Sequence, residues 1–367
     1  MKTYKLLTPG PLTTTKSVKE EMLIDRCTWD DEYKMITQKI RNQLLEIASA
    51  PSERYTTVLM QGSGSFGVEA TLCTAISTCD KCLLLINGAY GERIAAMADR
   101  LGIHHTVYAT KCDSIHDIGR IRNILENDYT ITHIVMVHCE TTTGILNPLE
   151  EVARISLEFG KTLIVDAMSS FGGIPIDMQS LGIDFLISSA NKCIQGVPGF
   201  SFVIARKDKL SMCKGHSSSL ALDLYDQWRA MDKSGKWRYT SPTHVVAAFA
   251  KALDELEAEG GVSARHVRYH KNNVLLRSRL SEAGIESYIA SELQSPIITT
   301  FLFPDEDFDF ECFYSHVKDR GYIMYPGKLT DKDTFRIGNI GEIYEENTLE
   351  LCNIIEDYMR GRELPPL

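Results

Sequence analysis

Two short segments constrain this chain most: residues 163–166 (LIVD) and residues 187–200, which contain Lys192. The first is an apolar run, rich in branched side chains, that ends in Asp166, and this pattern predicts a buried parallel strand with the carboxylate at its carboxyl end. Residues 185–187 repeat the pattern and lead through small polar residues to Lys192. The carboxyl ends of strands in an open α/β sheet lie along one edge and carry the ligand, so Asp166 and Lys192 are expected to share a site.

A lysine held in this way, with a carboxylate partner, suits one cofactor, pyridoxal 5′-phosphate. That cofactor is bound as a Schiff base to a lysine amine, and an acidic side chain pairs with its pyridine nitrogen. Lys192, between a strand end and the turn at residues 196–199, is the candidate for the amine that also moves protons, and Asp166 is the candidate for the carboxylate. The alternative is a surface lysine in a loop and an aspartate that caps a helix. The predicted strands, and a phosphate-binding turn upstream, weigh against it.

That turn is the segment GSGSFG at residues 62–67, which lies between a predicted strand and a predicted helix. The same arrangement occurs in the dinucleotide-binding motif of oxidoreductases, but here the next strand ends in Asn87, where such a fold requires an Asp or Glu. What remains is a set of backbone N–H groups, serine hydroxyls and a helix N-terminus directed at one phosphate. Ser63, Gly64 and Ser65 are the candidate phosphate contacts, with a plain strand-to-helix turn as the alternative.

Tyr90 and Arg336 are further candidates for this site. Tyr90 follows a predicted strand and opens a helix, so its ring can stack on a pyridine ring, which contributes about 0.5–1.5 kcal/mol beyond area burial. Arg336 lies between Phe335 and Ile337 in a predicted strand, and a buried guanidinium needs an anionic partner such as a carboxylate or a phosphonate. The alternatives are a core tyrosine and a structural ion pair.

Composition and charge narrow the classes of partner. With a formal net charge of −10 and no basic run, the chain is not expected to bind nucleic acid or anionic membranes. The sequence shows neither a signal-peptide core nor an apolar run of membrane length, and its ten cysteines have no repeating spacing, which favours a reducing cytoplasm. The CxxC at residues 79–82 lacks the second pair that a zinc site requires, so no metal is predicted.

The order of the predicted elements indicates two domains, as does the length of 367 residues. Strands and helices alternate up to about residue 205, which is typical of a doubly wound or three-layer α/β fold with a mainly parallel sheet. The remainder mixes helices with a few strands in an α+β pattern. We expect a large cofactor-binding domain at residues 14–245 and a small domain formed by residues 1–13 and 246–367.

Segments spread over nearly the whole chain resemble the class V aminotransferases of fold type I, enzymes that use pyridoxal 5′-phosphate. The resemblance implies that Lys192 and Asp166 are the catalytic residues, and that the active sites are shared between the two subunits of a homodimer. The segments that carry it are LTPGP (7–11), QGSGS (61–65), NGAYG (87–91), ETTTG (140–144), VDAMSSFGG (165–173), SANKCIQGVPG (189–199) and FRIGNIG (335–341). The cofactor-binding residues that it implies are Ser63, Gly64, Ser65, Tyr90, Thr141, Asp166, Lys192 and, from the neighbouring subunit, Thr240.

The resemblance also implies the reaction. Arg336 matches the anion-binding arginine of the family, and Thr8 and Gly10 in the N-terminal arm are further candidates for substrate binding. The stretch around Lys192, together with residues 223–228 and 236–238, is most similar to a branch that degrades phosphonates, which implies 2-aminoethylphosphonate as amino donor and pyruvate as acceptor. The alternatives are alanine:glyoxylate or serine:pyruvate transamination with the same residues. A non-catalytic binding module would leave Asp166 and Lys192 without a purpose.

Overall fold

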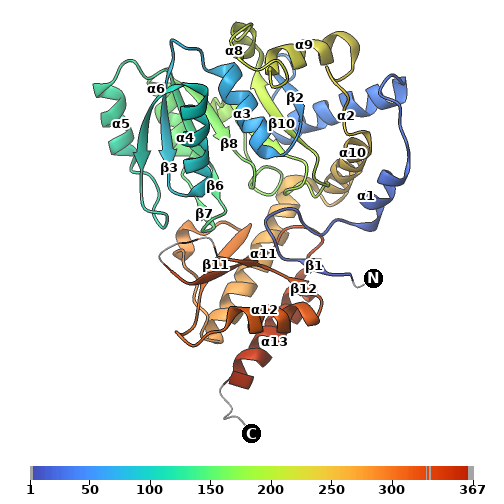
Figure 1. Cartoon of the computed structure of the whole chain (residues 1–367), viewed down its shortest axis with the longest axis vertical. Helices are drawn as coiled ribbons and strands as arrows, with labels where there is room; N and C mark the ends of the chain where they lie inside the picture. Colours follow the sequence, from blue (N-terminus) through green and yellow to red (C-terminus); the bar gives the residue numbers. More distant parts are fainter. Residues whose placement is uncertain (1–2, 328, 330–331, 363–367) are drawn as a thin grey trace.

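Within the described residues of the computed structural model, 3–327, 329 and 332–362, the main sheet has seven strands (Figure 1). Neighbouring strands are parallel except where β10 pairs with β2 and β9. The fold class predicted from the alternating pattern is therefore confirmed. In sheet order the strands are β2 (Tyr55–Gln61), β10 (Phe200–Arg206), β9 (Phe185–Ser189), β8 (Thr162–Asp166), β5 (His133–Val137), β3 (Lys81–Ile86) and β4 (His104–Ala109).

Helices cover both faces of this sheet, which explains why its strands are nearly continuous apolar runs. Along β3, Leu83 and Leu85 pack into one hydrophobic cluster, whereas Cys82, Leu84 and Ile86 pack into the cluster on the opposite face. The first cluster takes side chains from α2, α5, α6 and α10, and the second takes them from α3, α4, α8 and α9. These helices are α2 (Asp31–Ile47), α3 (Gly64–Ala75), α4 (Ala89–Leu101), α5 (Ile118–Asn127), α6 (Leu149–Glu158), α8 (Lys207–Met212), α9 (Leu224–Ser234) and α10 (Thr243–Ala258).

A separate hydrophobic core lies among the C-terminal elements, below the main sheet in Figure 1. Its centre is a group of aromatic rings that includes Phe301, Phe313 and Phe335. The N-terminal strand β1 (Lys5–Leu6) pairs in parallel with β12 (Tyr322–Ile323), so the first residues of the chain join this part. The other elements here are α11 (Gly261–Glu282), η2 (Ser291–Leu293), β11 (Ile298–Leu302), α12 (Phe310–Asp319), β13 (Tyr325–Pro326), β14 (Thr334–Gly338) and α13 (Glu345–Arg362).

The short elements that connect these parts include a small hairpin next to the main sheet. After β5 the chain passes through His138 into the first strand of this hairpin. The domain boundary predicted after residue 245 stays a prediction. Residues 1–2 and 363–367, at the two ends of the predicted small domain, lie outside the described residues. The remaining short elements are α1 (Lys16–Glu20), η1 (Glu21–Leu23), β6 (Cys139–Glu140), β7 (Ile145–Leu146) and α7 (Met178–Leu181).

Two elements have no clear signal in the sequence pattern. Strand β4 lies at the edge of the sheet, where Tyr108 is its one buried side chain, so it lacks an apolar run. Helix α9 contains the aromatic and polar residues 223–228; Asp223 caps it by accepting a hydrogen bond from the backbone N–H of Asp226. None of the described helices is both long and apolar enough to cross a membrane.

Candidate active site

A cavity of about 250 Å³ opens at the carboxyl ends of the central strands. Asp166 is the last residue of β8, and Lys192 follows the end of β9, which pairs with β8. The side chains that the sequence placed at one sheet edge therefore line one cavity. Its wall is formed by Gly10, Ser63, Gly64, Ser65, Val68, Tyr90, Arg93, Ile94, Met97, Asp166, Met168, Ser189, Asn191 and Lys192.

Lys192 is held by its own turn and by the N-terminal arm. The backbone N–H of Gln195 donates to the carbonyl of Lys192 at 2.7 Å, and Gln195 is a buried non-glycine residue with φ +68°. The ammonium Nζ donates to the backbone carbonyl of Pro9 at 2.8 Å. Burial lowers the pKa of Lys192, although Tyr90 and Asp166 act in the opposite direction. The amine is thus easier to deprotonate than an exposed lysine, as a nucleophile requires.

Gly10 is the arm residue closest to this lysine. It has φ +110°, and a Cβ atom there would lie 2.5 Å from the carbonyl oxygen of Asn191 and 2.7 Å from Cδ of Lys192. Only glycine satisfies both the backbone conformation and the close approach. The predicted substrate contact Gly10 therefore lies in the cavity wall, whereas Thr8 is buried and its hydroxyl donates to the carbonyl of Pro11.

Asp166 is a buried carboxylate that accepts few hydrogen bonds from the protein. Its Oδ1 accepts from the backbone N–H of Met168 at 2.9 Å. Burial raises the pKa of Asp166 to about 6; the charge of Glu140 adds to the rise, and Lys192 and Arg93 oppose it. A carboxylate in this position is stabilised by any cationic N–H group that enters the cavity. The protonated pyridine nitrogen of pyridoxal 5′-phosphate is such a group.

This shift predicts how pH acts on the cofactor-free protein. Since the pKa of Asp166 is higher in the folded than in the unfolded chain, its contribution to stability is complete below about pH 4 and is lost as the pH rises through about 6. Relative to the free energy of unfolding of the Asp166→Asn variant, that of the wild-type protein should fall by about 3 kcal/mol over that pH window. At higher pH the two free energies should change with pH in the same way. Urea denaturation at a series of pH values measures this difference. Profiles that stay parallel throughout would contradict it.

The part of the cavity wall formed by the start of α3 suits a phosphate. Ser63 is the N-cap of α3, but its side chain makes no capping hydrogen bond, and Gly64 and Ser65 form the first turn of the helix. The partial positive charge of the helix N-terminus therefore faces the cavity, next to two hydroxyls. A Cβ atom on Gly64 would lie 2.3 Å from Sδ of Met168, so only a glycine here allows the side chain of Met168 to pack against the start of α3. Nη1 of Arg93 donates to the hydroxyl of Ser65 at 3.3 Å and brings a formal positive charge to the same part of the wall.

Glu140 is a buried carboxylate near the cavity that the sequence pattern did not single out. It is completely buried, and burial raises its pKa although hydrogen bonds act in the opposite direction. Its carboxylate accepts from the backbone N–H of Tyr90 at 3.0 Å, from the N–H of Thr142 at 3.1 Å and from the hydroxyl of Thr142 at 2.6 Å. These bonds fix the start of α4 and therefore the ring of Tyr90. The signal in the sequence was an acidic residue three positions after the apolar run of β5.

Arg336 lies in β14, outside the cavity wall but connected to it. Nη1 donates to the carbonyl of Thr141 at 3.1 Å, and Nε donates to the carbonyl of Pro326 at 3.1 Å. Burial lowers the pKa of Arg336, and the nearby Tyr90 acts against this shift. No carboxylate of the described residues forms an ion pair with it, so the guanidinium keeps donors for an anionic ligand.

The remaining candidates, Thr141 and Thr240, do not line this cavity. Thr141 is buried beside Arg336, to which it offers its backbone carbonyl, and its side chain is not part of the cavity wall. Thr240 is exposed on the surface and does not line the cavity of its own chain. Arg93, Met168 and Asn191 line the cavity without having been singled out by the sequence, because their positions depend on how separate strands and helices meet.

Comparison with known proteins gives a consistent result. The family model for aminotransferase class-V matches residues 27–324. A 2-aminoethylphosphonate–pyruvate transaminase of Lysinibacillus sphaericus is 63% identical over 98% of each chain, and one of Phocaeicola vulgatus is 52% identical over 97% of this chain and 99% of its own. Among solved structures, an alanine–glyoxylate aminotransferase from Nostoc has a TM-score of 0.88 at 24% identity, covering 98% of this chain and 96% of its own. Pyridoxamine-pyruvate aminotransferase from Mesorhizobium loti has a TM-score of 0.91 at 19% identity, covering 100% and 94%.

Proposed function

This chain belongs to the class-V aminotransferase family, and from that premise we propose that it transfers the amino group of 2-aminoethylphosphonate to pyruvate. The products would be phosphonoacetaldehyde and L-alanine, in a step of phosphonate degradation. The observation that carries the proposal is the shared cavity of Lys192 and Asp166, together with the guanidinium of Arg336, which has no ion-pair partner among the described residues. The high identity to transaminases of that name over nearly the full length supports the choice of substrates.

The residues of the cavity fit both the phosphate and the ring of pyridoxal 5′-phosphate. Ser63, Gly64 and Ser65 would hold its phosphate, Asp166 would accept a hydrogen bond from the ring nitrogen, and Tyr90 would stack on the ring. When bound, this cofactor supplies a carbon that exchanges amino groups and a ring that accepts electron density. Lys192 would carry it at rest. Once freed, Nζ of Lys192 would take a proton from the amino-bearing carbon of the donor and later return one to the acceptor.

Arg336 would bind the anionic end of each substrate. Its planar fork binds a phosphonate or a carboxylate in a bidentate manner, so one anchor serves both halves of the reaction. Holding the anion fixes the direction of the C–H bond to be broken, which is an effect of orientation rather than of acid–base chemistry. Tyr325, whose ring centroid is 5.6 Å from the guanidinium carbon, limits the positions that Arg336 can adopt.

The visible absorption spectrum of the holoenzyme tests this proposal. Addition of 2-aminoethylphosphonate should remove the absorption band of the bound cofactor, and subsequent addition of pyruvate should restore it. Parallel additions of L-alanine and L-serine are the comparison. A protein that ignores the phosphonate but responds to L-serine would be a serine:pyruvate or alanine:glyoxylate aminotransferase instead. A protein that binds no pyridoxal 5′-phosphate would overturn the role of Lys192.

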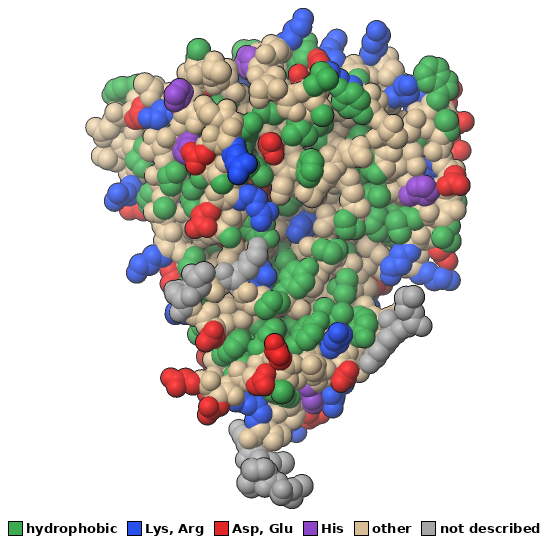
Figure 2. Space-filling view, in the orientation of Figure 1, with side chains coloured by type: hydrophobic (Ala, Val, Ile, Leu, Met, Phe, Trp, Pro, Cys, Tyr) green, Lys and Arg blue, Asp and Glu red, His purple; other side chains and the backbone are tan. Residues whose placement is uncertain are grey.

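A homodimer with shared sites is part of the proposal. Hydrophobic side chains gather on the face shown in Figure 2, and near the cavity mouth Phe66 on α3 is 51% exposed. Leu220, which precedes α9, and Tyr239 are 74% and 48% exposed. Such side chains favour association with a second copy of the chain. Thr240, adjacent to Tyr239, would then reach the phosphate in the partner's cavity.

Replacement of Thr240 by valine should weaken cofactor binding while leaving the dimer intact, because one hydroxyl donor to the phosphate is lost. A loss of affinity of about 10-fold is expected for one hydrogen bond to a charged group. Fluorescence titration of the cofactor-free protein measures affinity, and light scattering should give twice the chain mass of 41.2 kDa. Thr130→Val, at an exposed threonine before β5 on the opposite edge of the sheet, is the control. A monomer with full cofactor affinity would contradict the shared site.

The free thiols of the cysteines favour the cytoplasm as the compartment of this protein. All ten are free thiols in the described part of the chain, and Cys73, Cys82, Cys139, Cys193, Cys213 and Cys352 are buried. Free thiols in such number are typical of a reducing environment, where burial protects them from oxidation.

A further inference from the structure

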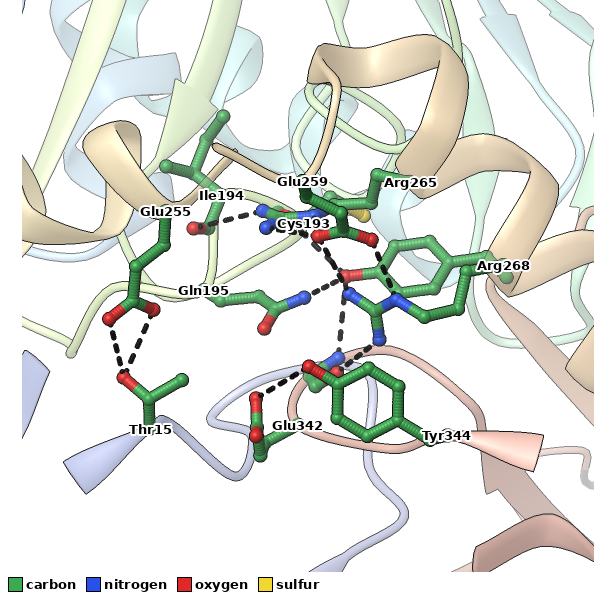
Figure 3. A network of polar contacts seen from close by, with 12 residues as sticks. Thr15, Cys193, Ile194, Gln195, Glu255, Glu259, Arg265, Arg268, Glu342 and Tyr344 are labelled. Carbon is green, nitrogen blue, oxygen red and sulfur yellow. Dashed lines mark hydrogen bonds and ion pairs between the residues drawn. The ribbon is translucent and has the colours of Figure 1, made fainter. Parts of the chain in front are cut away.

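Glu259 lies at the centre of a polar network that the proposed reaction does not use (Figure 3). The residue caps the carboxyl end of α10, and its carboxylate binds two arginines of the following helix, α11. Oε2 accepts from Nη2 of Arg265 at 2.7 Å, and Oε1 accepts from Nε of Arg268 at 2.7 Å. A second bond from each arginine, at 2.9 and 3.2 Å, completes the set. Glu259 therefore fixes both guanidinium groups in one orientation.

Arg265 uses its remaining donors on the turn that carries Lys192. Its Nη1 donates to the backbone carbonyl of Cys193 at 2.9 Å and to that of Ile194 at 3.3 Å. The side chain is only 3% exposed, so an unpaired charge there would be costly. The two residues that follow Lys192 are thus held by a buried arginine from another element.

Arg268 uses its remaining donors on the loop that follows the strand of Arg336. Its Nη1 donates to the carbonyl of Gly341 at 2.8 Å and to that of Ile343 at 2.9 Å. The guanidinium also lies over the ring of Tyr344, 4.8 Å from its centroid. Since β14 ends at Gly338, Arg268 holds the loop that directly follows the strand of Arg336.

Tyr269, the residue after Arg268 in α11, contacts the same two segments. Its hydroxyl accepts from Nε2 of Gln195 at 2.8 Å and from the backbone N–H of Gly341 at 3.4 Å. Gln195 is the residue with φ +68° in the turn of Lys192, so the network supports a strained backbone position. These two hydrogen bonds of Tyr269 thus connect the turn of Lys192 with the loop that follows the strand of Arg336.

We propose that Glu259 is a positioning residue that sets the place of the Lys192 turn relative to the Arg336 strand, through Arg265 and Arg268. The inference rests on the proposed roles of Lys192 and Arg336. A substrate whose anion is bound by Arg336 must present its amino-bearing carbon to Nζ of Lys192, so a shift between the two segments misplaces the reacting atoms. Displacements of about 1 Å can cost on the order of 10²-fold in rate.

Hydrogen exchange of the holoenzyme, followed by mass spectrometry, tests this inference without any substrate. In the Glu259→Gln variant, exchange should become at least about 10-fold faster in two segments, residues 190–199 and residues 338–344. Arg265→Lys should accelerate the first segment alone and Arg268→Lys the second alone, because a lysine cannot reach the carbonyls and Glu259 together. The matched control is Glu356→Gln, which breaks a similar ion pair of α11, with Arg279 at 2.6 Å, away from the cavity.

Kinetics supply the second measurement. Arg265→Lys should mainly lower kcat, Arg268→Lys should mainly raise the KM of both substrates, and Glu259→Gln should lower kcat/KM by about 10-fold or more. If Glu259→Gln changes exchange in neither segment relative to Glu356→Gln, the inference is overturned. The exchange result does not depend on which amino donor the enzyme uses, so failure of the proposed function and failure of the positioning role are distinguishable. The two lysine variants keep the positive charge and report on each segment even if Glu259→Gln does not fold.

Discussion

Replacement of Lys192 by alanine is expected to lower kcat by at least about 10⁴-fold, the largest effect of any single substitution in this chain. Among the described residues that line the cavity, Lys192 is the only one with an amine side chain, and the pKa of that amine is lowered by burial. No neighbouring group can take over both cofactor attachment and proton transfer. Steady-state kinetics with 2-aminoethylphosphonate and pyruvate measure the loss.

The control for this substitution is Lys161→Ala. Lys161 is also a partly buried lysine that donates to a backbone carbonyl, that of Ile131 at 2.6 Å, but it precedes β8 at the opposite edge of the sheet. This variant should keep kcat within about twofold, since it alters only a surface contact. A small primary amine added to Lys192→Ala should restore part of the activity, which separates lost proton transfer from misfolding. Activity of Lys192→Ala within about 10-fold of the wild type would contradict the assigned role.

Replacement of Arg336 by lysine is expected to raise the KM of both substrates by about 10- to 100-fold, with a smaller effect on kcat. Lysine keeps the charge but not the planar fork, and its shorter reach cannot maintain the contacts with the carbonyls of Thr141 and Pro326. Each half-reaction is measured separately from the absorbance of the bound cofactor, which gives one binding constant per substrate.

Arg277→Lys is a suitable control for this prediction. Arg277 is a partly buried arginine whose pKa is also lowered by burial, and its Nε donates to Oδ1 of Asn273, away from the cavity. Its substitution should leave both binding constants unchanged. A rise confined to 2-aminoethylphosphonate or to pyruvate would show that the two anions have separate anchors, against the shared role of Arg336.

The shared location of Asp166 and Lys192 was predictable because it is encoded locally. Asp166 terminates an apolar strand, Lys192 lies between a strand end and a glycine-rich turn, and Ser63–Gly64–Ser65 connect a strand to a helix N-terminus. In a parallel sheet these features all point to the same edge, so alternation of strands and helices was enough to bring them into one cavity. The fold class followed from the same pattern. Strand β4 could not be predicted from this pattern, because an edge strand needs no apolar run.

By itself, the sequence determined the three-layer α/β fold and the pairing of Asp166 with Lys192, since both depend on short stretches whose side chains repeat with the period of a strand. Only the tertiary structure decided that the carbonyl of Pro9 accepts from Lys192, that Glu140 holds the start of α4, and that Glu259 connects two distant segments. These contacts join residues up to 183 positions apart, as between Pro9 and Lys192. Their partners are selected by the packing of whole elements, and no local pattern of apolar and polar residues encodes that packing.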